Sequence, residues 1–378
     1  MKKKLRVLSV FGTRPEAIKM MPVVDELKRR PDCFESYVAV TGQHREMLSQ
    51  VLRLFNCTPD ADLSIMTERQ SLEDITSRVL YGVSGIIKEL KPHIVLVQGD
   101  TTTTFAASLA AYYCGVKVGH VEAGLRTWNK FNPYPEEMNR RLTGVIADIH
   151  FAPTEKARQN LLSEGTRPET ILLTGNTVID ALRQIVSMDY EFEDNGLKGL
   201  DFDGKRVIVL TTHRRESFGG PMEGTLAAIN EIVEGFPDVE VVFPVHRNPN
   251  VREAVGRVMN GGNRIHLIEP VDYLPFVHLM NRSYMILTDS GGVQEEAPSL
   301  GKPVLVLRDT TERPEGIEAG TARLVGTSRE KIVREAALLL NDKKEYAAMA
   351  NAVNPYGDGK AAVYIADALG AMDKGGLQ

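Results

Sequence analysis

A chain of 378 residues that is 43% hydrophobic and 25% charged has the composition of a globular protein with two or three domains. Its formal net charge of −5 gives no electrostatic reason to expect a nucleic acid or an anionic membrane as partner, and no apolar stretch approaches the length needed to cross a bilayer. The three cysteines, Cys33, Cys57 and Cys114, are scattered without metal-ligand spacing, which fits reduced thiols and predicts a cytoplasmic protein.

Short apolar runs alternate with helical stretches along the chain. In the first half, these runs predict buried strands at residues 7–11, 37–40, 94–97, 117–120, 149–152 and 171–173. Helical periodicity lies between them at residues 16–30, 72–90 and 102–113. Strands that alternate with helices predict a parallel sheet with right-handed crossovers.

The second half repeats this alternation after residues 189–204, which are acidic and have little apolar pattern. Further strands are predicted at residues 207–210, 239–245, 265–268, 285–287 and 304–306, and helices at residues 330–340, 345–350 and 361–369. We therefore predict a first domain of residues 1–188, a linker of residues 189–204 and a second domain of residues 205–359, with a C-terminal helix in residues 360–373 that completes the first domain. The predicted fold class is α/β, with two doubly wound Rossmann-like domains that face each other across a cleft.

The loop after the first predicted strand places basic side chains at this cleft. Gly12 opens the turn, and Pro15 suits the first turn of a helix. Arg14 is therefore held at the strand end, where a guanidinium is well sited for a diphosphate. Lys19, about one helical turn further on, fits a ligand-binding role and a solvated charge equally well.

Three carboxylates in the first domain lie at strand ends or at a helix start. Asp100 and Glu122 each follow a predicted strand closely, and threonines near Asp100 are available to cap the next helix in its place. Of the two acids at a later helix start, we expect Glu136 to point inward. Carboxylates that converge on one cleft suit general acid–base chemistry, because one can act as base while another holds a proton. A metal site is the alternative, but no histidine stands at metal-ligand spacing, so we expect neither a metal nor a cofactor.

The second domain carries donors at the corresponding strand ends. His213 begins a His-Arg-Arg run after the domain's first strand, where it offers a donor to a phosphate or a leaving group. His246 follows the next strand, although a single histidine there is often only packed. Phe276 offers an aromatic face to a base, but core packing explains it nearly as well. Arg313 stands before a proline, as Arg14 does.

A glycine turn after the strand at residues 285–287 has the features of an anion site. Ser290, Gly291 and Gly292 stand between that strand and a helix start, so their backbone amides point to the positive end of the helix dipole. The glycines allow a ligand to approach the backbone closely. Glu296, one turn further on, is placed to meet a ribose hydroxyl. An isolated Ser-Gly-Gly would more often be an ordinary strand-to-helix turn.

These segments resemble the bacterial non-hydrolysing UDP-N-acetylglucosamine 2-epimerases over essentially the whole chain. The motifs that carry the resemblance are FGTRPEAIK, GDTTTT, GHVEAGLRT, PEEMNRR, TGNTVIDAL, HRRESFG, PVHRNPNVRE, DSGGVQEEAPSLGKPVLVLRDTTERPE and NPYGDG. The resemblance implies the two-domain GT-B-type fold of nucleotide-sugar glycosyltransferases, with UDP held mainly by the C-terminal domain. It also implies a homodimer and a supply of precursors for surface polysaccharides.

The resemblance further implies roles for individual residues. Asp100, Glu122 and Glu136 would be the acid–base groups, and His213 would assist the departing UDP. The residues expected to contact the substrate are Arg14, Lys19, Asp100, Glu122, His213, Phe276, Ser290, Gly291, Gly292, Glu296 and Arg313. Phe276 would meet the uracil and Glu296 the ribose.

Family members also use a second molecule of UDP-N-acetylglucosamine as an activator beside the catalytic site. The matching positions are Gln43, His44, Glu46, Arg69, Arg214 and His246. Glu46 departs from the family pattern, because some members have Gln there and a carboxylate would weaken the binding of a diphosphate. Trp128 and Lys130 also depart from it, by replacing smaller or acidic residues in the loop before Glu136.

The chemistry expected for such an enzyme is anti elimination of UDP to a 2-acetamidoglucal, followed by re-addition. Simple deprotonation is implausible because no carbonyl lies next to the second carbon of the sugar. Three rival functions share the nucleotide site: a glycosyltransferase, which needs an acceptor; a hydrolysing epimerase, which releases UDP; and a non-catalytic sensor, which gives no reason for three carboxylates.

Overall fold

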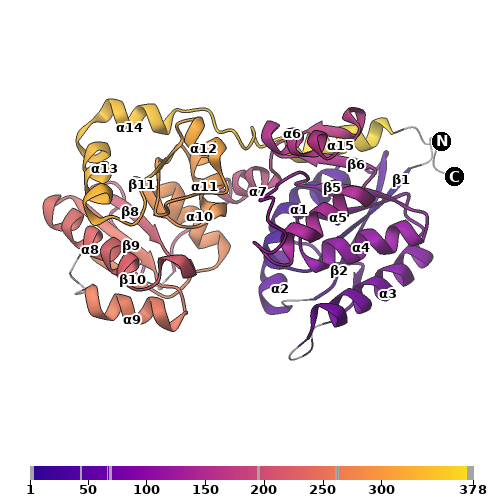
Figure 1. Ribbon diagram of the computed structural model, residues 1–378, viewed down its shortest axis with the longest axis horizontal. Coiled ribbons are helices and arrows are strands. Elements are labelled where there is room, and N and C mark those ends of the chain that lie inside the picture. Colours follow the sequence, from indigo (N-terminus) through magenta and orange to yellow (C-terminus); the bar gives the residue numbers. More distant parts are fainter. Residues whose placement is uncertain are drawn as a thin grey trace. The chain divides into compact units, whose positions relative to one another are not determined.

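The computed structural model describes residues 4–42, 45–65, 67, 70–193, 196–259, 262 and 264–372. Contacts between residues divide the chain into two compact units (Figure 1). Unit 1 comprises Met1–Ala181 and Tyr356–Gln378, and unit 2 comprises Leu182–Pro355. The chain therefore passes from one unit to the other twice.

Unit 1 is built on a seven-stranded parallel sheet. Its order is β3 (Ala61–Asp62), β2 (Phe34–Val40), β1 (Leu5–Phe11), β4 (Ile94–Gln98), β5 (Lys117–Val121), β6 (Ile149–Ala152) and β7 (Ile171–Leu173). The strand order reverses between β1 and β4. Ligands of open α/β sheets bind beside such a switch point, at the carboxyl ends of the strands.

The helices of unit 1 alternate with its strands along the chain, except α15, which comes after unit 2. They are α1 (Arg14–Lys28), α2 (Arg45–Leu54), α3 (Leu72–Leu90), α4 (Thr102–Tyr113), α5 (Glu136–Ile146), α6 (Glu155–Ser163), the 3₁₀ turn η1 (Pro168–Thr170), α7 (Thr177–Val186), which runs into unit 2, and α15 (Ala361–Ala371). Capping boxes at Thr13 and Ser71 fix the starts of α1 and α3. α3 packs beside α4, and α15 packs beside α1 (Figure 1).

Unit 2 repeats the design with six parallel strands. Their order is β10 (Ile265–Ile268), β9 (Val239–Pro244), β8 (Arg206–Thr211), β11 (Met285–Thr288), β12 (Val304–Val306) and β13 (Ala322–Leu324), with the reversal between β8 and β11. The helices are η2 (Arg215–Ser217), α8 (Gly220–Gly235), α9 (Pro249–Val258), α10 (Tyr273–Arg282), α11 (Gly291–Glu296), η3 (Ala297–Leu300), α12 (Pro314–Glu318), α13 (Arg329–Asn341) and α14 (Lys343–Ala350).

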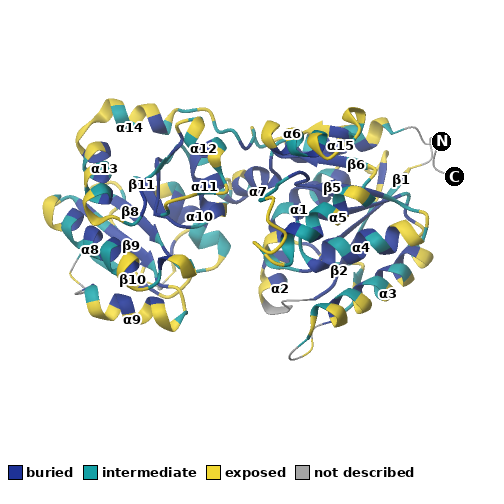
Figure 2. Cartoon of the chain, in the orientation of Figure 1, coloured by how far each residue is buried: buried dark blue, intermediate teal, exposed yellow. Residues whose placement is uncertain are grey.

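The strands of both sheets are largely buried, and the outer faces of the helices are exposed (Figure 2). Two doubly wound α/β units are therefore confirmed, and the strands predicted from apolar runs are all present. The short strands β3 and β13 were not predicted, because two or three residues carry too little pattern. No helix among the described residues combines the length and apolar character of a membrane-spanning segment.

Residues 189–204, for which the sequence predicts a linker, include side chains that pack against other residues of unit 2. The ring of Tyr190 stacks on His278 with 4.9 Å between ring centroids, and the guanidinium of Arg282 lies 5.0 Å from the ring centroid of Phe192. Leu197 is buried. The division between the units falls earlier, between residues 181 and 182 within α7.

The C-terminal helix α15 is held on unit 1 by a buried carboxylate at the end of α7's first turn. Asp180 accepts hydrogen bonds from the backbone amides of Ala361 at 3.2 Å and Ala362 at 2.9 Å, which belong to the first turn of α15. Burial raises the pKa of Asp180 to about 6, although these amides oppose the shift. An ion pair of 2.5 Å between Arg30 and Asp367 adds a second link between α1 and α15.

The raised pKa of Asp180 predicts how the stability of unit 1 depends on pH. Folded Asp180 binds its proton more tightly than the unfolded chain does, so its contribution to the free energy of unfolding is greatest below pH 4 and is lost as pH rises through about 6. The loss amounts to about 3 kcal/mol. We expect Asp180→Asn to remove most of the change in the free energy of unfolding of unit 1 between pH 4 and 7, measured by urea unfolding. The exposed Asp189→Asn should leave that change as it is in the unmodified protein. An equal dependence of the unfolding free energy on pH in all three proteins would contradict the prediction.

Candidate active site

In unit 1, Glu16 joins the two loops that flank the switch point. Its Oε2 accepts the backbone amides of Gly12 at 3.1 Å and Thr13 at 2.7 Å, in the loop after β1. Its Oε1 accepts the hydroxyls of Thr101 at 2.7 Å and Thr104 at 3.2 Å, in the segment after β4. Burial raises the pKa of Glu16, and these hydrogen bonds work against that shift. The two loops are therefore fixed to each other through one carboxylate.

Glu122, directly after β5, is a buried carboxylate with several donors. Lys19 Nζ lies 2.5 Å from its Oε1, Asn176 Nδ2 donates to the same oxygen at 3.0 Å, and Gln98 Nε2 donates to Oε2. The backbone φ of Glu122 is +62°, a left-handed conformation that is costly for a residue with a side chain. The side chain is thus held in one position by partners from three other elements. The lysine that fitted two roles equally well from the sequence is an ionic partner of Glu122.

Asp100 stands in the neighbouring loop after β4. Its carboxylate pairs with the guanidinium of Arg140 on α5, and its backbone carbonyl accepts Asn139 Nδ2 at 3.0 Å. The preceding Gly99 is fixed by His120, whose Nε2 lies 2.7 Å from the Gly99 carbonyl oxygen. Burial lowers the pKa of His120 to about 3, so this imidazole is neutral at pH 7.

Glu136 and Glu137, adjacent at the start of α5, have different environments. Glu137 is fully buried and accepts the backbone amides of Thr127 and Trp128, each at 3.0 Å. Glu136 is half-buried, and its Oε2 is buried without a hydrogen-bond partner among the described residues. Glu136 therefore has an acceptor that a bound ligand could satisfy, whereas Glu137 is committed to the loop.

The loops after β5 and β4 are adjacent, because β4 and β5 pair along their whole length. A Cβ atom added to Gly99 would lie 3.5 Å from Glu122 Oε2, so this carboxylate lies next to the residue that precedes Asp100. Arg14, at the first position of α1, is half-buried at the same edge of the sheet. Unit 1 thus brings Arg14, Lys19, Asp100 and Glu122 to the carboxyl ends of β1, β4 and β5.

In unit 2, Asp289 performs the linking role that Glu16 has in unit 1. It follows β11, is fully buried, and its Oδ2 accepts the Thr212 hydroxyl at 3.0 Å and the backbone amides of His213 at 2.7 Å and Arg214 at 2.8 Å. Its Oδ1 lies 3.2 Å from His213 Nδ1. Burial raises the pKa of Asp289, but the contacts from His213 and the amides outweigh it, so the net shift is downward.

The imidazoles of His213 and His246 are stacked, with ring centroids 5.3 Å apart and planes 18° from parallel. His213 Nδ1 faces a carboxylate oxygen, which only accepts hydrogen bonds, so this contact favours the tautomer with the proton on Nδ1. His246 Nδ1 accepts the backbone amide of Asn248 at 3.1 Å, so this nitrogen is unprotonated. Burial, with His213 beside it, lowers the pKa of His246.

The start of α11 lies among basic side chains. A Cβ atom added to Gly291 would lie 3.9 Å from Arg214 Nη2 and 4.0 Å from the guanidinium carbon of Arg313. Ser290 is the N-cap residue, and its side chain makes no capping bond to the helix. A Cβ atom on Gly292 would lie 3.8 Å from Glu296 Oε1, which places that carboxylate beside the same turn.

Glu295 and Phe276 lie in α11 and α10 of unit 2. The buried Glu295 pairs with Arg313 Nε and so orients the guanidinium. Phe276 lies half-buried in the first turn of α10. Among the predicted residues of the second domain, His213 follows β8, Ser290, Gly291 and Gly292 follow β11, and Glu296 ends α11. Arg313 directly precedes α12, and Phe276 lies in α10.

The predicted activator residues are only partly described. Gln43, His44 and Arg69 lie outside the described residues, and Glu46 lies in α2 with its side chain outside them. Arg214 and His246 lie with His213 and the start of α11, in the same surface as the predicted substrate residues.

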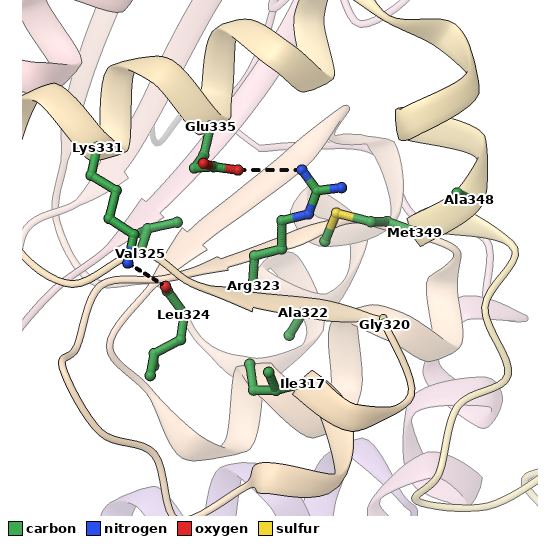
Figure 3. A pocket seen from close by; sticks show the side chains of 10 residues that line it. All are labelled: Ile317, Gly320, Ala322, Arg323, Leu324, Val325, Lys331, Glu335, Ala348 and Met349. Atoms are coloured by element: carbon green, nitrogen blue, oxygen red, sulfur yellow. Dashed lines mark hydrogen bonds and ion pairs between the residues drawn. The ribbon is translucent and has the colours of Figure 1, made fainter.

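A pocket of about 530 Å³ lies elsewhere in unit 2, around β13 and the helices α12 to α14 (Figure 3). Its charged groups are already paired: Arg323 with Glu335 at 3.3 Å and with Glu345, and Lys331 Nζ with the Leu324 carbonyl at 3.0 Å. None of the predicted site residues lines it. Within the described ranges, no three or more His, Cys, Asp or Glu side chains are grouped so as to hold a metal ion.

The comparisons with known proteins agree with one another. A family model described as UDP-N-acetylglucosamine 2-epimerase matches residues 25–370. The UDP-N-acetylglucosamine 2-epimerase of Bacillus subtilis (strain 168) is 57% identical over 367 residues, which are 97% of this chain and 95% of that protein. That of Escherichia coli (strain K12) is 55% identical over 370 residues, 97% of this chain and 98% of that protein. The crystal structure of UDP-GlcNAc 2-epimerase from Neisseria meningitidis bound to UDP-GlcNAc is similar with a TM-score of 0.83 at 48% identity, covering 97% of this chain and 99% of that one.

The contacts of Asp289 generate a prediction about His213. In Asp289→Asn the amide group of the new side chain donates to His213 Nδ1, so we expect the ring proton to move to Nε2, which ¹⁵N-histidine NMR detects. The free energy of unfolding of unit 2 should fall by about 1–3 kcal/mol, because a buried acceptor of two amides is weakened. The exposed Asp203→Asn is the control, and an unchanged His213 tautomer would refute the link.

Proposed function

The chain belongs to the UDP-N-acetylglucosamine 2-epimerase family, and on that premise we propose that it interconverts UDP-N-acetylglucosamine and UDP-N-acetylmannosamine. Such an enzyme is an isomerase. The single observation that carries the assignment is the pair Asp100 and Glu122, two carboxylates on adjoining loops of unit 1, each held by a cation. A protein that only bound a nucleotide-sugar would have no use for them.

The reaction we propose proceeds by elimination and re-addition. The hydrogen at the second carbon is not acidic, so its removal must accompany cleavage of the bond from the first carbon to the UDP oxygen. A carboxylate takes the proton, UDP leaves with the bonding electron pair, and a 2-acetamidoglucal remains. UDP then adds back to the first carbon while a proton is delivered to the opposite face of the second. Asp100, Glu122 and Glu136 supply the base and the acid.

The leaving group is negatively charged, and unit 2 has the donors that stabilise it. The backbone amides at the start of α11, with Arg214 and Arg313 beside Gly291, suit a diphosphate. His213 Nδ1 faces Asp289, and this contact, which favours a proton on that nitrogen, orients the ring for a role in UDP departure. Phe276 and Glu296 are the proposed partners of the uracil and the ribose. The Neisseria relative was solved bound to UDP-GlcNAc, which supports this ligand.

Activation and assembly form a further part of the proposal. We propose that a second UDP-N-acetylglucosamine acts as activator through Arg214 and His246, together with Gln43, His44 and Arg69. The stacking of His246 on His213 supports a link between that site and the leaving-group histidine. A homodimer, a cytoplasmic location and the supply of surface-polysaccharide precursors remain predictions from the family resemblance.

The proposed route predicts exchange of one hydrogen with solvent. When UDP-N-acetylglucosamine is incubated with the protein in heavy water, the UDP-N-acetylmannosamine formed should carry deuterium at the second carbon, seen as loss of that proton signal in NMR. No sugar acceptor should be needed, and free UDP should not accumulate with turnover. Retention of the original hydrogen excludes this route, a requirement for an acceptor indicates a glycosyltransferase, and steady release of UDP indicates a hydrolysing epimerase.

The carboxylates should matter for turnover more than for folding. We expect Asp100→Asn and Glu122→Gln each to lower kcat by about 10²- to 10⁴-fold, the usual effect of losing a general acid or base. Asp367→Asn, which changes an exposed carboxylate on α15, should leave kcat unchanged. Near-normal turnover in both active-site variants would remove Asp100 and Glu122 from the mechanism.

A further inference from the structure

Arg140 links two of the acidic residues around the proposed site. Its Nη2 bonds Asp100 Oδ2, and its Nη1 donates to Glu137 Oε2 at 3.2 Å. The side chain is mostly buried, with 12% of its surface exposed, so this guanidinium is confined to a few orientations. Of the side chains in the described part of the chain, Arg140 alone bonds the Asp100 carboxylate, and it does so through one oxygen. Because this bond fixes the orientation of the Asp100 carboxylate, it also fixes the position of the second carboxylate oxygen.

Glu137 carries the same network into the loop between β5 and α5. Besides Arg140, its carboxylate accepts the backbone amides of Thr127 and Trp128, so both oxygens are used. The loop is anchored again at Arg126, whose fully buried side chain pairs with Glu164 at 2.6 Å. The loop then exposes aromatic rings at Trp128, Phe131 and Tyr134 before reaching Glu136. A rigid connection therefore runs from Asp100 to the loop.

We infer that Arg140 is a positioning residue for Asp100, and that Glu137 ties this position to the loop of residues 127–135. The catalytic part of the inference rests on the proposed function. A guanidinium forms two directed bonds at a fixed angle, whereas a lysine ammonium cannot bond both carboxylates in the same geometry. Asp100 and the loop that leads to Glu136 are therefore positioned together, which fits a reaction in which one face of a sugar loses a proton and the other gains one.

The first test is a double-mutant cycle on turnover. Arg140→Met keeps the length of the side chain and removes both bonds; Glu137 retains its two backbone donors, so unit 1 should still fold. We expect kcat to fall by about 100-fold, as for a misplaced catalytic group, while KM stays within about threefold. Arg140→Lys should recover only part of the loss. Because Arg140 acts through Asp100, Arg140→Met should change kcat by less than about threefold in an Asp100→Asn background.

Arg141 offers a matched control on the same helix. Its guanidinium lies 3.2 Å from Glu164 and is 43% exposed, and it has no bond to Asp100 or Glu137. Glu164 keeps its two bonds to Arg126 in Arg141→Met, so the loop stays anchored there. The kcat of this variant should equal that of the unmodified protein. Full activity of Arg140→Met, or equal losses from Arg140→Met and Arg141→Met, would overturn the inference.

The second test needs no catalysis, because Trp128 is the only tryptophan in the chain. Glu137→Gln weakens the hold on the Trp128 amide, so we expect lower fluorescence anisotropy of this tryptophan, because the loop that carries it becomes more mobile. Urea unfolding of the Asp100 and Arg140 single and double variants should show a coupling of at least about threefold in the unfolding equilibrium constant. If the unmodified chain does not epimerise its substrate, the proposed function fails. The fluorescence and urea-unfolding measurements still decide whether Arg140 is linked to Asp100 and whether Glu137 is linked to the loop. Unchanged anisotropy together with zero coupling refutes them.

Discussion

Both units depend on one kind of interaction: a buried carboxylate that joins two loops across the point where the strand order reverses. In unit 1, Glu16 accepts backbone amides from the loop after β1 and hydroxyls from the segment after β4. In unit 2, Asp289, which follows β11, accepts a hydroxyl and two backbone amides from the loop after β8. Backbone amides next to a helix start are otherwise unsatisfied, so a buried anion there stabilises the loops and fixes their spacing. Arg14, Asp100, His213 and Ser290 of the proposed site extend from loops that these two carboxylates hold.

Neighbouring side chains also hold the proposed catalytic carboxylates in positions that would be unfavourable without them. Glu122 occupies a left-handed backbone conformation that costs about 1–3 kcal/mol for a residue with a side chain, and it is buried as well. Lys19 compensates the charge, and the amides of Gln98 and Asn176 occupy further lone pairs. Asp100 has a cation of its own in Arg140. Because Glu122 and Asp100 are each paired with a cation of their own, the two carboxylates can lie on adjoining loops without sharing one cation.

Much of the fold was readable from the sequence, because a strand buried on both faces is a continuous apolar run and ends visibly at a polar residue. The same rule located Asp100, Glu122, His213 and Ser290, each at or near a strand end. It could not identify their partners. Glu16 meets Thr101 85 positions away, and Asp289 meets His213 76 positions away, distances that no local pattern spans. The sequence favoured Glu136 over Glu137 as the inward residue, but both suit a helix start. Only packing shows that Glu137 is the fully buried one and is committed to the loop, while one oxygen of Glu136 is left without a partner among the described residues.

The path of the chain has a consequence for how the protein is made on the ribosome. Unit 2 is one uninterrupted stretch, so it is complete as soon as residue 355 has left the exit tunnel. Unit 1 begins to emerge first, yet α15 and the amides that satisfy Asp180 follow only after unit 2. Until α15 has left the tunnel, the side of α1 that packs on α15 is uncovered and Asp180 lacks these two amides. Co-translational chaperones that shield apolar surface have a defined target in that interval, and a product that stops before α15 exposes the same side of α1.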